Sequence, residues 1–157
     1  MVTVAFVCLG NICRSPMAEA VFAEHVRREG LEDVIKVDSF GTSAFHVGNK
    51  PDKRTISTCD KNGTPIQHRA QQIYPHHFTK FDYILGMDRE NLGNLKCMAP
   101  KNSTATIDLF GSYRTSNDLN RIIDDPYYGG QNGFDITYDQ VTDFSKGLLE
   151  DIRKNHL

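Results

Sequence analysis

Short, mainly apolar runs alternate with amphipathic stretches along most of the chain. The first run, from Thr3 to Cys8, is β-branched and aromatic, which is typical of a strand buried on both faces of a parallel sheet. Similar runs predict further strands over residues 34–40, 81–87 and 104–110. The pattern therefore predicts four strands.

Stretches in which apolar residues recur at helical spacing follow these runs, the last of them after a long intervening stretch. Ser15 and Pro16 supply a helix start, and apolar residues then recur every three or four positions until Gly30. Two more helices are predicted over residues 51–61 and 88–95. Near the C-terminus, an apolar stripe predicts a final helix through these residues: Val141, Phe144, Leu148 and Ile152.

The alternation of strands and helices favours an α/β sandwich built on a parallel sheet, with ligand sites at the carboxyl ends of the strands. Cys8 stands at such an end. The stretch from 111 to 137 is rich in Gly, Asp, Asn and Tyr, and we expect it to be irregular. Loops of that length in compact domains are often functional, so this stretch is a candidate source of site residues.

The length of 157 residues suits one domain spanning 1–157, without an internal repeat or linker. The formal charge of −2 argues against a nucleic-acid partner, because binding to a phosphate backbone needs a basic face. The apolar stretch from Val2 to Cys8 lacks a basic leader and is too short to span a bilayer. We therefore expect a cytoplasmic protein without a membrane partner.

The chain has four cysteines: Cys8, Cys13, Cys59 and Cys97. Four are too few for a disulfide scaffold in a chain of this length, and a reducing compartment would keep them as thiols. Cys59 and Cys97 lack partners at the spacing of metal ligands, and so does the pair His76 and His77. We therefore expect no metal site.

The segment that carries the clearest chemistry begins at Cys8, which is followed six positions later by Arg14. A loop between a strand end and a helix N-terminus can turn its backbone N–H groups inward, and the helix dipole adds positive potential. Such a cradle binds phosphate and stabilises a thiolate, while a guanidinium can hold two phosphate oxygens at once. The predicted phosphate-binding residues are Leu9, Gly10, Asn11, Ile12, Cys13 and Arg14.

The spacing alone leaves a structural alternative open, in which Cys8 is a buried strand residue and Arg14 a solvated helix-start residue. The context favours the loop: Gly10 permits the turn, Asn11 tolerates left-handed backbone and Ser15 can hydrogen-bond a thiolate. The glycine-rich motifs of nucleotide-binding proteins do not occur in the sequence.

The segment VCLGNICRSPMAE resembles the signature of the low-molecular-weight protein tyrosine phosphatases. The resemblance extends over nearly the whole chain, through SFGTSAFHVG, PDKRT, FDYILGMD and IIDDPYYGG. It implies a single-domain, three-layer sandwich with a twisted four-stranded parallel sheet and helices on both faces. It also implies that no metal or organic cofactor is needed.

The resemblance also implies the reaction. Cys8 attacks phosphorus, the departing tyrosyl oxygen is protonated, and water then hydrolyses the cysteinyl phosphate. Phosphotyrosine-containing proteins would be the substrates and small aryl phosphates would also be hydrolysed, an acid phosphatase activity. Inorganic phosphate would be both product and inhibitor, and the enzyme is expected to be a monomer.

The same resemblance assigns Asp125 as the general acid, which later acts as a base toward water. Protonation of a leaving group in the transition state typically contributes on the order of 10²–10⁴ in rate. From the residues alone, Asp124 and Asp125 could equally be turn residues before Pro126. The family match selects Asp125, because it immediately precedes the proline.

Aromatic walls of the substrate pocket are implied at Tyr127 and Tyr128, with Phe45 on the opposite side, where the family often carries Trp or Tyr. Two flat walls would select a phenyl ring. From the residues alone, these rings could instead pack their loops onto the core, which is the commoner fate of aromatic side chains.

A supporting hydrogen-bond network is implied by four residues that match the family: Asn11, Ser15, Ser43 and His68. Such a network would fix the loop and orient Ser15 toward Cys8. Taken alone, His68 would be an ordinary loop or core histidine. One departure is visible, because Gln71 follows Ala70 where the family commonly carries arginine, and this questions one supporting ion pair but no step of the chemistry.

Cys13 resembles the second cysteine of the family, which forms a reversible disulfide with the nucleophile; a small loop-packing residue is the alternative. Two other functions also remain open. Thiol-coupled arsenate reductases share the loop but need closely paired additional cysteines, whereas Cys59 and Cys97 are isolated. A non-catalytic phosphate-binding module would not need both Cys8 and Asp125.

Overall fold

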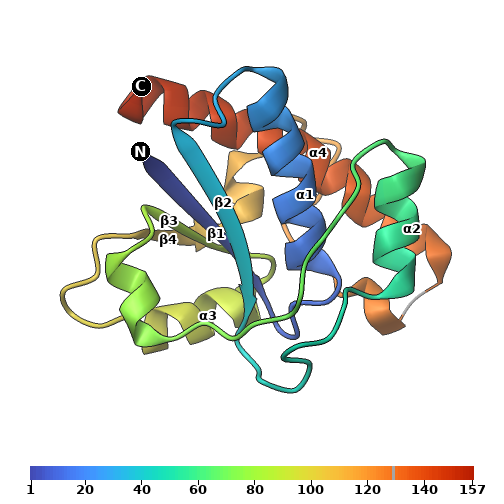
Figure 1. Cartoon of the computed structure of the whole chain (residues 1–157), viewed down its shortest axis with the longest axis horizontal. Helices are drawn as coiled ribbons and strands as arrows, with labels where there is room; N and C mark the ends of the chain where they lie inside the picture. Colours follow the sequence, from blue (N-terminus) through green and yellow to red (C-terminus); the bar gives the residue numbers. More distant parts are fainter. Residues whose placement is uncertain (129) are drawn as a thin grey trace.

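The computed structural model describes residues 1–128 and 130–157, and leaves the side chains of Tyr128 and Gln131 undescribed. A parallel sheet lies at its centre, with the strand order β2-β1-β3-β4 (Figure 1). Its strands are β1 (Val2–Cys8), β2 (Ile35–Gly41), β3 (Tyr83–Gly86) and β4 (Thr106–Leu109).

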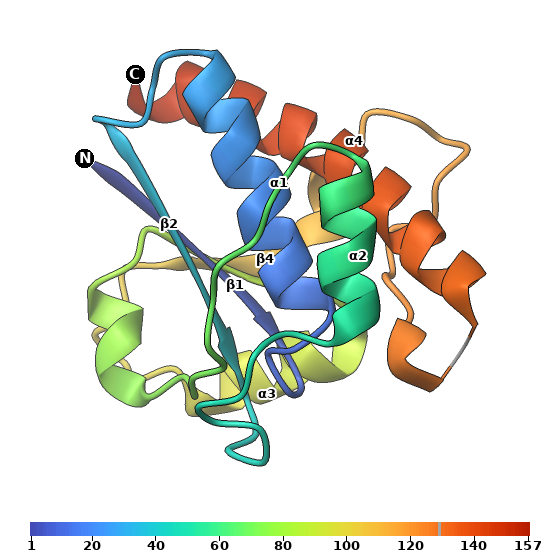
Figure 2. The same cartoon turned by 45° about the vertical axis from the view of Figure 1, so that its right-hand side comes forward.

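Helices cover both faces of this sheet. They are α1 (Arg14–Arg28), α2 (Lys53–Lys61), α3 (Arg89–Met98) and α4 (Gln131–His156), with short 3₁₀ helices η1 (Pro75–Thr79), η2 (Phe110–Tyr113) and η3 (Pro126–Tyr128). Figures 1 and 2 show α1, α2 and α4 gathered on one side of the sheet and α3 on the other. The expected three-layer sandwich is thus confirmed.

β1 explains the two apolar cores, because its successive side chains point to opposite faces of the sheet. Val4 and Phe6 pack into the core formed with α1 and α4, whereas Ala5 and Val7 pack into the core on the side of α3 and η1. All four side chains are fully buried. A strand buried on both faces shows no polar alternation, which is why its sequence reads as a continuous apolar run.

The site is positioned by the order of the strands. β2 lies on one side of β1 and β3 on the other, so the chain changes direction across the sheet at the carboxyl end of β1. Ligands of open α/β sheets bind at such a switch point. Cys8 is the last residue of β1 and therefore stands at this position.

Two sequence expectations need correction. Residues 111–137 are not irregular throughout, because α4 already begins at Gln131, six residues before the expected end of the loop. Gly133 and several polar residues mask this first part of the helix, but the fully buried Phe134 continues its apolar face. Helix η1 was not expected, and its buried Phe78 fills the core beside α3.

Across the residues that the structure describes, no helix combines the length and the apolar character needed to cross a bilayer.

Candidate active site

Residues 8–14, which join β1 to α1, form the loop for which phosphate binding was predicted, the phosphate-binding loop. Its turn depends on Asn11, whose φ of 57° lies in the left-handed region that Asn tolerates better than most residues. The N–H group of Asn11 consequently points back at Cys8, with N to Sγ at 3.3 Å. The expected role of Asn11 in the turn is confirmed.

Neighbouring segments hold the loop from outside through its carbonyl groups. The carbonyl of Leu9 accepts from the N–H of Ser43 at 2.9 Å, and the carbonyl of Ile12 accepts from the N–H of Asp52 at 2.8 Å. Gly41 lets β2 approach closely, because a Cβ there would lie 2.8 Å from the Leu9 oxygen. With these carbonyls directed outward, the loop can present N–H groups to an anion.

Cys8 is buried at the base of this loop and has two donors near its sulfur. The Ser15 hydroxyl lies 3.0 Å from Sγ, and the Asn11 N–H is the second contact. Ser15 Oγ accepts from Asn11 Nδ2 at 2.8 Å, and its single proton can be donated either to the sulfur or to the carbonyl of Phe40, 3.3 Å away. In the described part of the chain, no side chain caps the N-terminus of α1, so the helix dipole also acts on this region.

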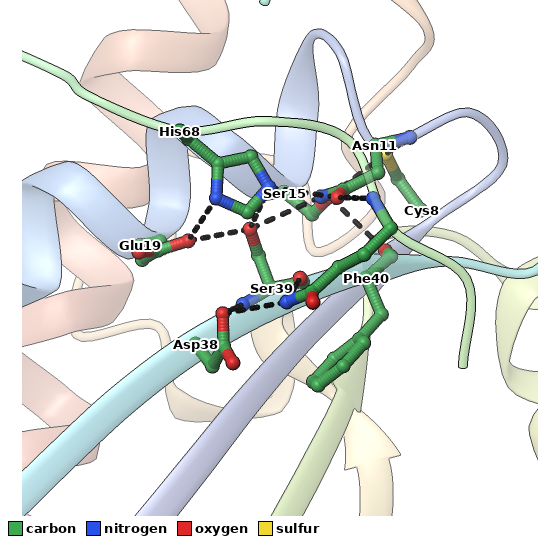
Figure 3. Close-up of polar contacts among 9 residues, drawn as sticks. Cys8, Asn11, Ser15, Glu19, Asp38, Ser39, Phe40 and His68 are labelled. Atoms are coloured by element: carbon green, nitrogen blue, oxygen red, sulfur yellow. Dashed lines mark hydrogen bonds and ion pairs between the residues drawn. The ribbon is translucent and has the colours of Figure 1, made fainter. Parts of the chain in front are cut away.

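Asn11 organises the hydrogen bonds behind the loop (Figure 3). Its Oδ1 accepts from His68 Nε2 at 2.7 Å and from the Gln71 N–H at 2.9 Å. Its Nδ2 donates to Ser15 and to Ser39. Because an amide oxygen only accepts, His68 must carry its proton on Nε2. The completely buried Asn11 therefore links His68 to Ser15 and, through Ser15, to Cys8.

His68 has a second partner on its other ring nitrogen. Nδ1 lies 3.3 Å from Glu19 Oε1, and Ser39 Oγ donates to the same oxygen at 2.6 Å. Burial, reinforced by the nearby Asp38 carboxylate, raises the pKa of Glu19 to about 7 against the lowering effect of the Ser39 hydrogen bond. The contact between Nδ1 and Oε1 is an ion pair only when His68 is protonated, and burial lowers the pKa of His68.

Gln71 stands where the resemblance suggests an arginine. Its Nε2 donates to Asp38 Oδ1 and to the carbonyl of Ser39, each at 2.9 Å. Gln71 therefore supports this segment through neutral hydrogen bonds and not through an ion pair.

Ser43 lies elsewhere than the expected network. Its N–H donates to Leu9, and its hydroxyl accepts from the N–H of Phe45 at 3.0 Å. These hydrogen bonds place Ser43 between the phosphate-binding loop and the wall that carries Phe45, rather than beside Asn11.

The Arg14 side chain is almost fully buried and is held in a fixed orientation. Nη1 donates to Asp88 Oδ2 at 2.6 Å and to the carbonyl of Ile123 at 2.9 Å. Asp88 caps the N-terminus of α3 and lies two residues after the end of β3. The sequence analysis missed Asp88, although its position after a predicted strand could have marked it.

Asp125 completes this group from a distant part of the chain. Its Oδ2 lies 3.7 Å from Arg14 Nη2, and its Oδ1 accepts from the N–H of Tyr127 at 3.0 Å. Asp124 is exposed and does not line the pocket described next. The structure thus brings Asp125, and not its neighbour, to the guanidinium.

A pocket of about 390 Å³ opens above the loop. Its lining combines the loop with Asp125 and two aromatic walls: Cys8, Leu9, Gly10, Ile12, Cys13, Arg14, Ser43, Phe45, His46, Asp125 and Tyr127. Phe45 is 85% exposed and Tyr127 is 42% exposed, so both rings can meet a ligand. His46 was not expected, and the side chain of Tyr128 lies outside the described residues.

One cluster among the described residues has donor atoms near enough to one another for a metal ion, namely Glu19, Asp38 and His68, within 4.8 Å. All three already hydrogen-bond to protein groups around Asn11. None of them lines the pocket above Cys8. The cluster therefore supports the loop from behind and takes no part in the chemistry of the pocket.

Comparison with known proteins agrees with this geometry. A family model described as low molecular weight phosphotyrosine protein phosphatase matches residues 3–157. Proteins with that description from Saccharomyces cerevisiae and Schizosaccharomyces pombe are 48% identical over 151 residues and 49% identical over 152 residues. The matches cover 95% and 96% of this chain, and 94% and 97% of the two relatives.

A solved structure gives the same result. The crystal structure of a protein tyrosine phosphatase from Entamoeba histolytica, with Hepes in its active site, superposes with a TM-score of 0.94 at 30% identity and covers 100% of both chains. The fold, the loop geometry and these similarities lead to one assignment. This chain belongs to the low molecular weight phosphotyrosine protein phosphatase family.

Proposed function

We propose that this chain hydrolyses phosphotyrosine in proteins, and small aryl phosphates, with Cys8 as nucleophile, Arg14 as phosphate clamp and Asp125 as general acid. One observation carries the assignment: a buried thiol with two hydrogen-bond donors, a fixed guanidinium and a carboxyl group line the same pocket. The reaction needs a nucleophile, a charge clamp and a proton donor, and these three residues supply them.

In the first step, the Cys8 thiolate attacks phosphorus, forming the S–P bond as the P–O bond to the aryl group breaks. Asp125 gives its proton to the departing oxygen. The loop N–H groups and Arg14 stabilise the charge on the three equatorial oxygens. The products of this step are cysteinyl phosphate and the dephosphorylated tyrosine residue of the substrate protein.

In the second step, Asp125 takes a proton from water while the water oxygen attacks phosphorus. The S–P bond breaks and the thiolate is regenerated, with the Ser15 hydroxyl placed to donate to the leaving sulfur. Inorganic phosphate is released from the loop that bound it as an ester. The same contacts support phosphate as a competitive inhibitor.

The aromatic walls support the choice of an aryl ester. Phe45 and Tyr127 stand above the loop, and a flat ring between them would extend its phosphate down to Cys8. Phosphotyrosine-containing proteins are therefore the proposed substrates. A monomer suits this role, since Cys8, Arg14 and Asp125 all come from one chain. The proposed location is the cytoplasm, whose reducing conditions would keep Cys8 as a thiol.

Replacing the acid tests its assignment. In Asp125→Ala we expect kcat/KM for phenyl phosphate to fall on the order of 10²-fold, because its leaving group needs a proton. The loss for p-nitrophenyl phosphate should be much smaller, since nitrophenolate is a good leaving group. Asp124→Ala is the matched control and should do little in either assay. If the two variants exchanged these effects, the assignment would be wrong by one residue.

The two rival functions find less support. An arsenate reductase needs cysteines that relay oxidation, but Cys59 is fully buried, with a pKa raised by burial to about 12, and Cys97 is exposed on α3. A binding module would not need an acid placed beside the clamp.

Cys13 is proposed to protect the nucleophile from irreversible oxidation. Peroxide would convert the Cys8 thiolate to a sulfenic acid, and Cys13 would attack that sulfur, forming a disulfide and releasing water. Burial, followed by the charges of Asp52 and Cys8, raises the pKa of Cys13 to about 12. Cys13 therefore stays a thiol while Cys8 is oxidised first.

Recovery after peroxide treatment tests this protection. We expect the wild type to regain activity with a dithiol, whereas Cys13→Ser should become progressively unrecoverable, each measured relative to its own initial activity. Free phosphate should slow the oxidation by occupying the loop. Cys97→Ser is the matched control. Mass spectrometry showing Cys8 linked to Cys59, or recovery without Cys13, would contradict the proposal.

A further inference from the structure

The first turn of α2 is tied to the phosphate-binding loop. Asp52 caps this helix, since its carboxylate accepts from the N–H of Arg54 at 2.8 Å. The N–H of Asp52 donates to the carbonyl of Ile12 at 2.8 Å. The start of α2 is therefore fixed relative to the loop that holds the nucleophile.

Arg54 extends from this turn to the segment that carries the acid. Its Nε and Nη2 donate to the two carboxylate oxygens of Asp52 at 3.1 and 3.2 Å. Nη2 also donates to the carbonyl of Tyr127 at 3.0 Å. One planar guanidinium thus spans two segments that are separated by 73 positions in the sequence, as expected of a forked donor.

Two aromatic rings also contact this guanidinium. Its central carbon lies 5.6 Å from the centroid of the Tyr127 ring and 4.6 Å from that of Phe134. Phe134 belongs to α4 and is fully buried. Arg54 therefore connects α2, α4 and the segment around η3. Figure 2 shows α2 lying beside the first part of α4.

The contact reaches the acid through a single residue. Tyr127 gives its carbonyl to Arg54, and its N–H donates to Asp125 Oδ1 at 3.0 Å. The other oxygen of Asp125 lies 3.7 Å from Arg14 Nη2. A displacement of Tyr127 would therefore move the carboxyl group relative to both Arg14 and the leaving oxygen.

The ion pair with Asp52 would add little to folding stability, because the Arg54 side chain is 36% exposed and exposed pairs are worth little. Its effect on the position of a short segment is larger. A misplacement of about 1 Å near a reacting group can cost on the order of 10²-fold in rate. Arg54 does not line the pocket, so it acts through Tyr127 rather than on the substrate.

We propose that Arg54 is a positioning residue for proton transfer: it holds the segment 125–127 against the start of α2, so that Asp125 reaches the leaving oxygen. The inference rests on the proposed role of Asp125 as general acid. It predicts a defect that depends on the leaving group, because only protonation of that group requires Asp125 in the first step.

The test compares Arg54→Ala with Lys53→Ala, an exposed neighbour on the same helix, and with Asp125→Ala. We measure kcat/KM for phenyl phosphate and for p-nitrophenyl phosphate, and the inhibition constant of inorganic phosphate. In Arg54→Ala, the first should fall about tenfold or more and the second less than about threefold, with phosphate inhibition within about twofold of wild type. Lys53→Ala should match the wild type.

A merely structural role would slow both substrates equally or weaken phosphate inhibition, and either result would overturn the inference. Arg54→Lys provides a second variant, because one ammonium group keeps the charge but cannot hold Asp52 and the Tyr127 carbonyl together. It should show the same leaving-group dependence to a smaller extent. If Asp125→Ala shows the dependence and both Arg54 variants do not, only the inference fails. If Asp125→Ala itself lacks it, the acid assignment fails and the inference falls with it.

Discussion

Cys8→Ser is expected to lower kcat for p-nitrophenyl phosphate below about one-thousandth of the wild-type value while leaving phosphate binding largely intact. A hydroxyl can occupy the place of Sγ and keep the contact with Ser15, so the loop should retain its shape. A serine hydroxyl is a weak nucleophile at neutral pH, because almost none of it is ionised. The reaction therefore loses its first step rather than its binding site.

The measurement combines three readings. Wild-type enzyme should release a burst of nitrophenol stoichiometric with enzyme and sensitive to vanadate, whereas Cys8→Ser should release none. Calorimetric titration with inorganic phosphate should show binding to both proteins. Cys97→Ser, at an exposed position on α3, is the control for a Cys to Ser change and should keep its burst. Residual turnover within tenfold of wild type would exclude Cys8 as the nucleophile.

The sequence predicts most elements of this fold because the central strands are buried on both faces. β1 and β3 leave no exposed side to carry a polar alternation, so their apolar runs stand out. The start of α4 was missed for the opposite reason. Its first two turns mix polar residues and Gly133 with the buried Phe134, the exposed Ile136 and the partly buried Tyr138, so the apolar face becomes regular only from Val141 onward.

The sequence could suggest Cys8 and Arg14 as the proposed nucleophile and clamp because they lie in one short segment with a physical rationale. The acid could not be assigned from the residues alone, since Asp124 and Asp125 are equally good turn residues and only the resemblance separated them. The partners of Arg14 were also hidden. Asp88 lies 74 positions away in the sequence, and no local pattern records which carboxylate a folded chain brings to a given guanidinium.

The network behind the loop shows the same limit. The resemblance named Asn11, Ser15 and His68, and the structure joins them by direct hydrogen bonds. The resemblance could not show which groups Gln71 would contact, because that depends on the folded distance from its amide to Asp38 and to the Ser39 carbonyl. Gln71 provides neutral hydrogen bonds to both.

Arg14→Lys is the second change from which we expect a large effect, because it keeps the charge and removes the planar fork. Arg14 uses Nη1 to hold Asp88 and the Ile123 carbonyl, which leaves Nη2 directed toward Asp125 and the pocket. A lysine ammonium could satisfy Asp88 or reach the phosphate, but it could not do both from one position. Loss of a preorganised donor to transition-state charge typically costs on the order of 10²–10³ in rate.

We therefore expect kcat/KM for p-nitrophenyl phosphate to fall by about 10²-fold or more in Arg14→Lys, with phosphate inhibition also weakened. Arg28→Lys, on the exposed part of the same helix, is the matched control and should retain wild-type kinetics. Thermal unfolding of both variants separates a catalytic loss from a folding defect. Because the two substitutions conserve charge, a fall in kcat/KM in Arg14→Lys alone would show that catalysis depends on the planar, two-pronged geometry of the guanidinium. Near-normal kinetics in Arg14→Lys would show instead that a point charge suffices and that Arg14 is not the clamp.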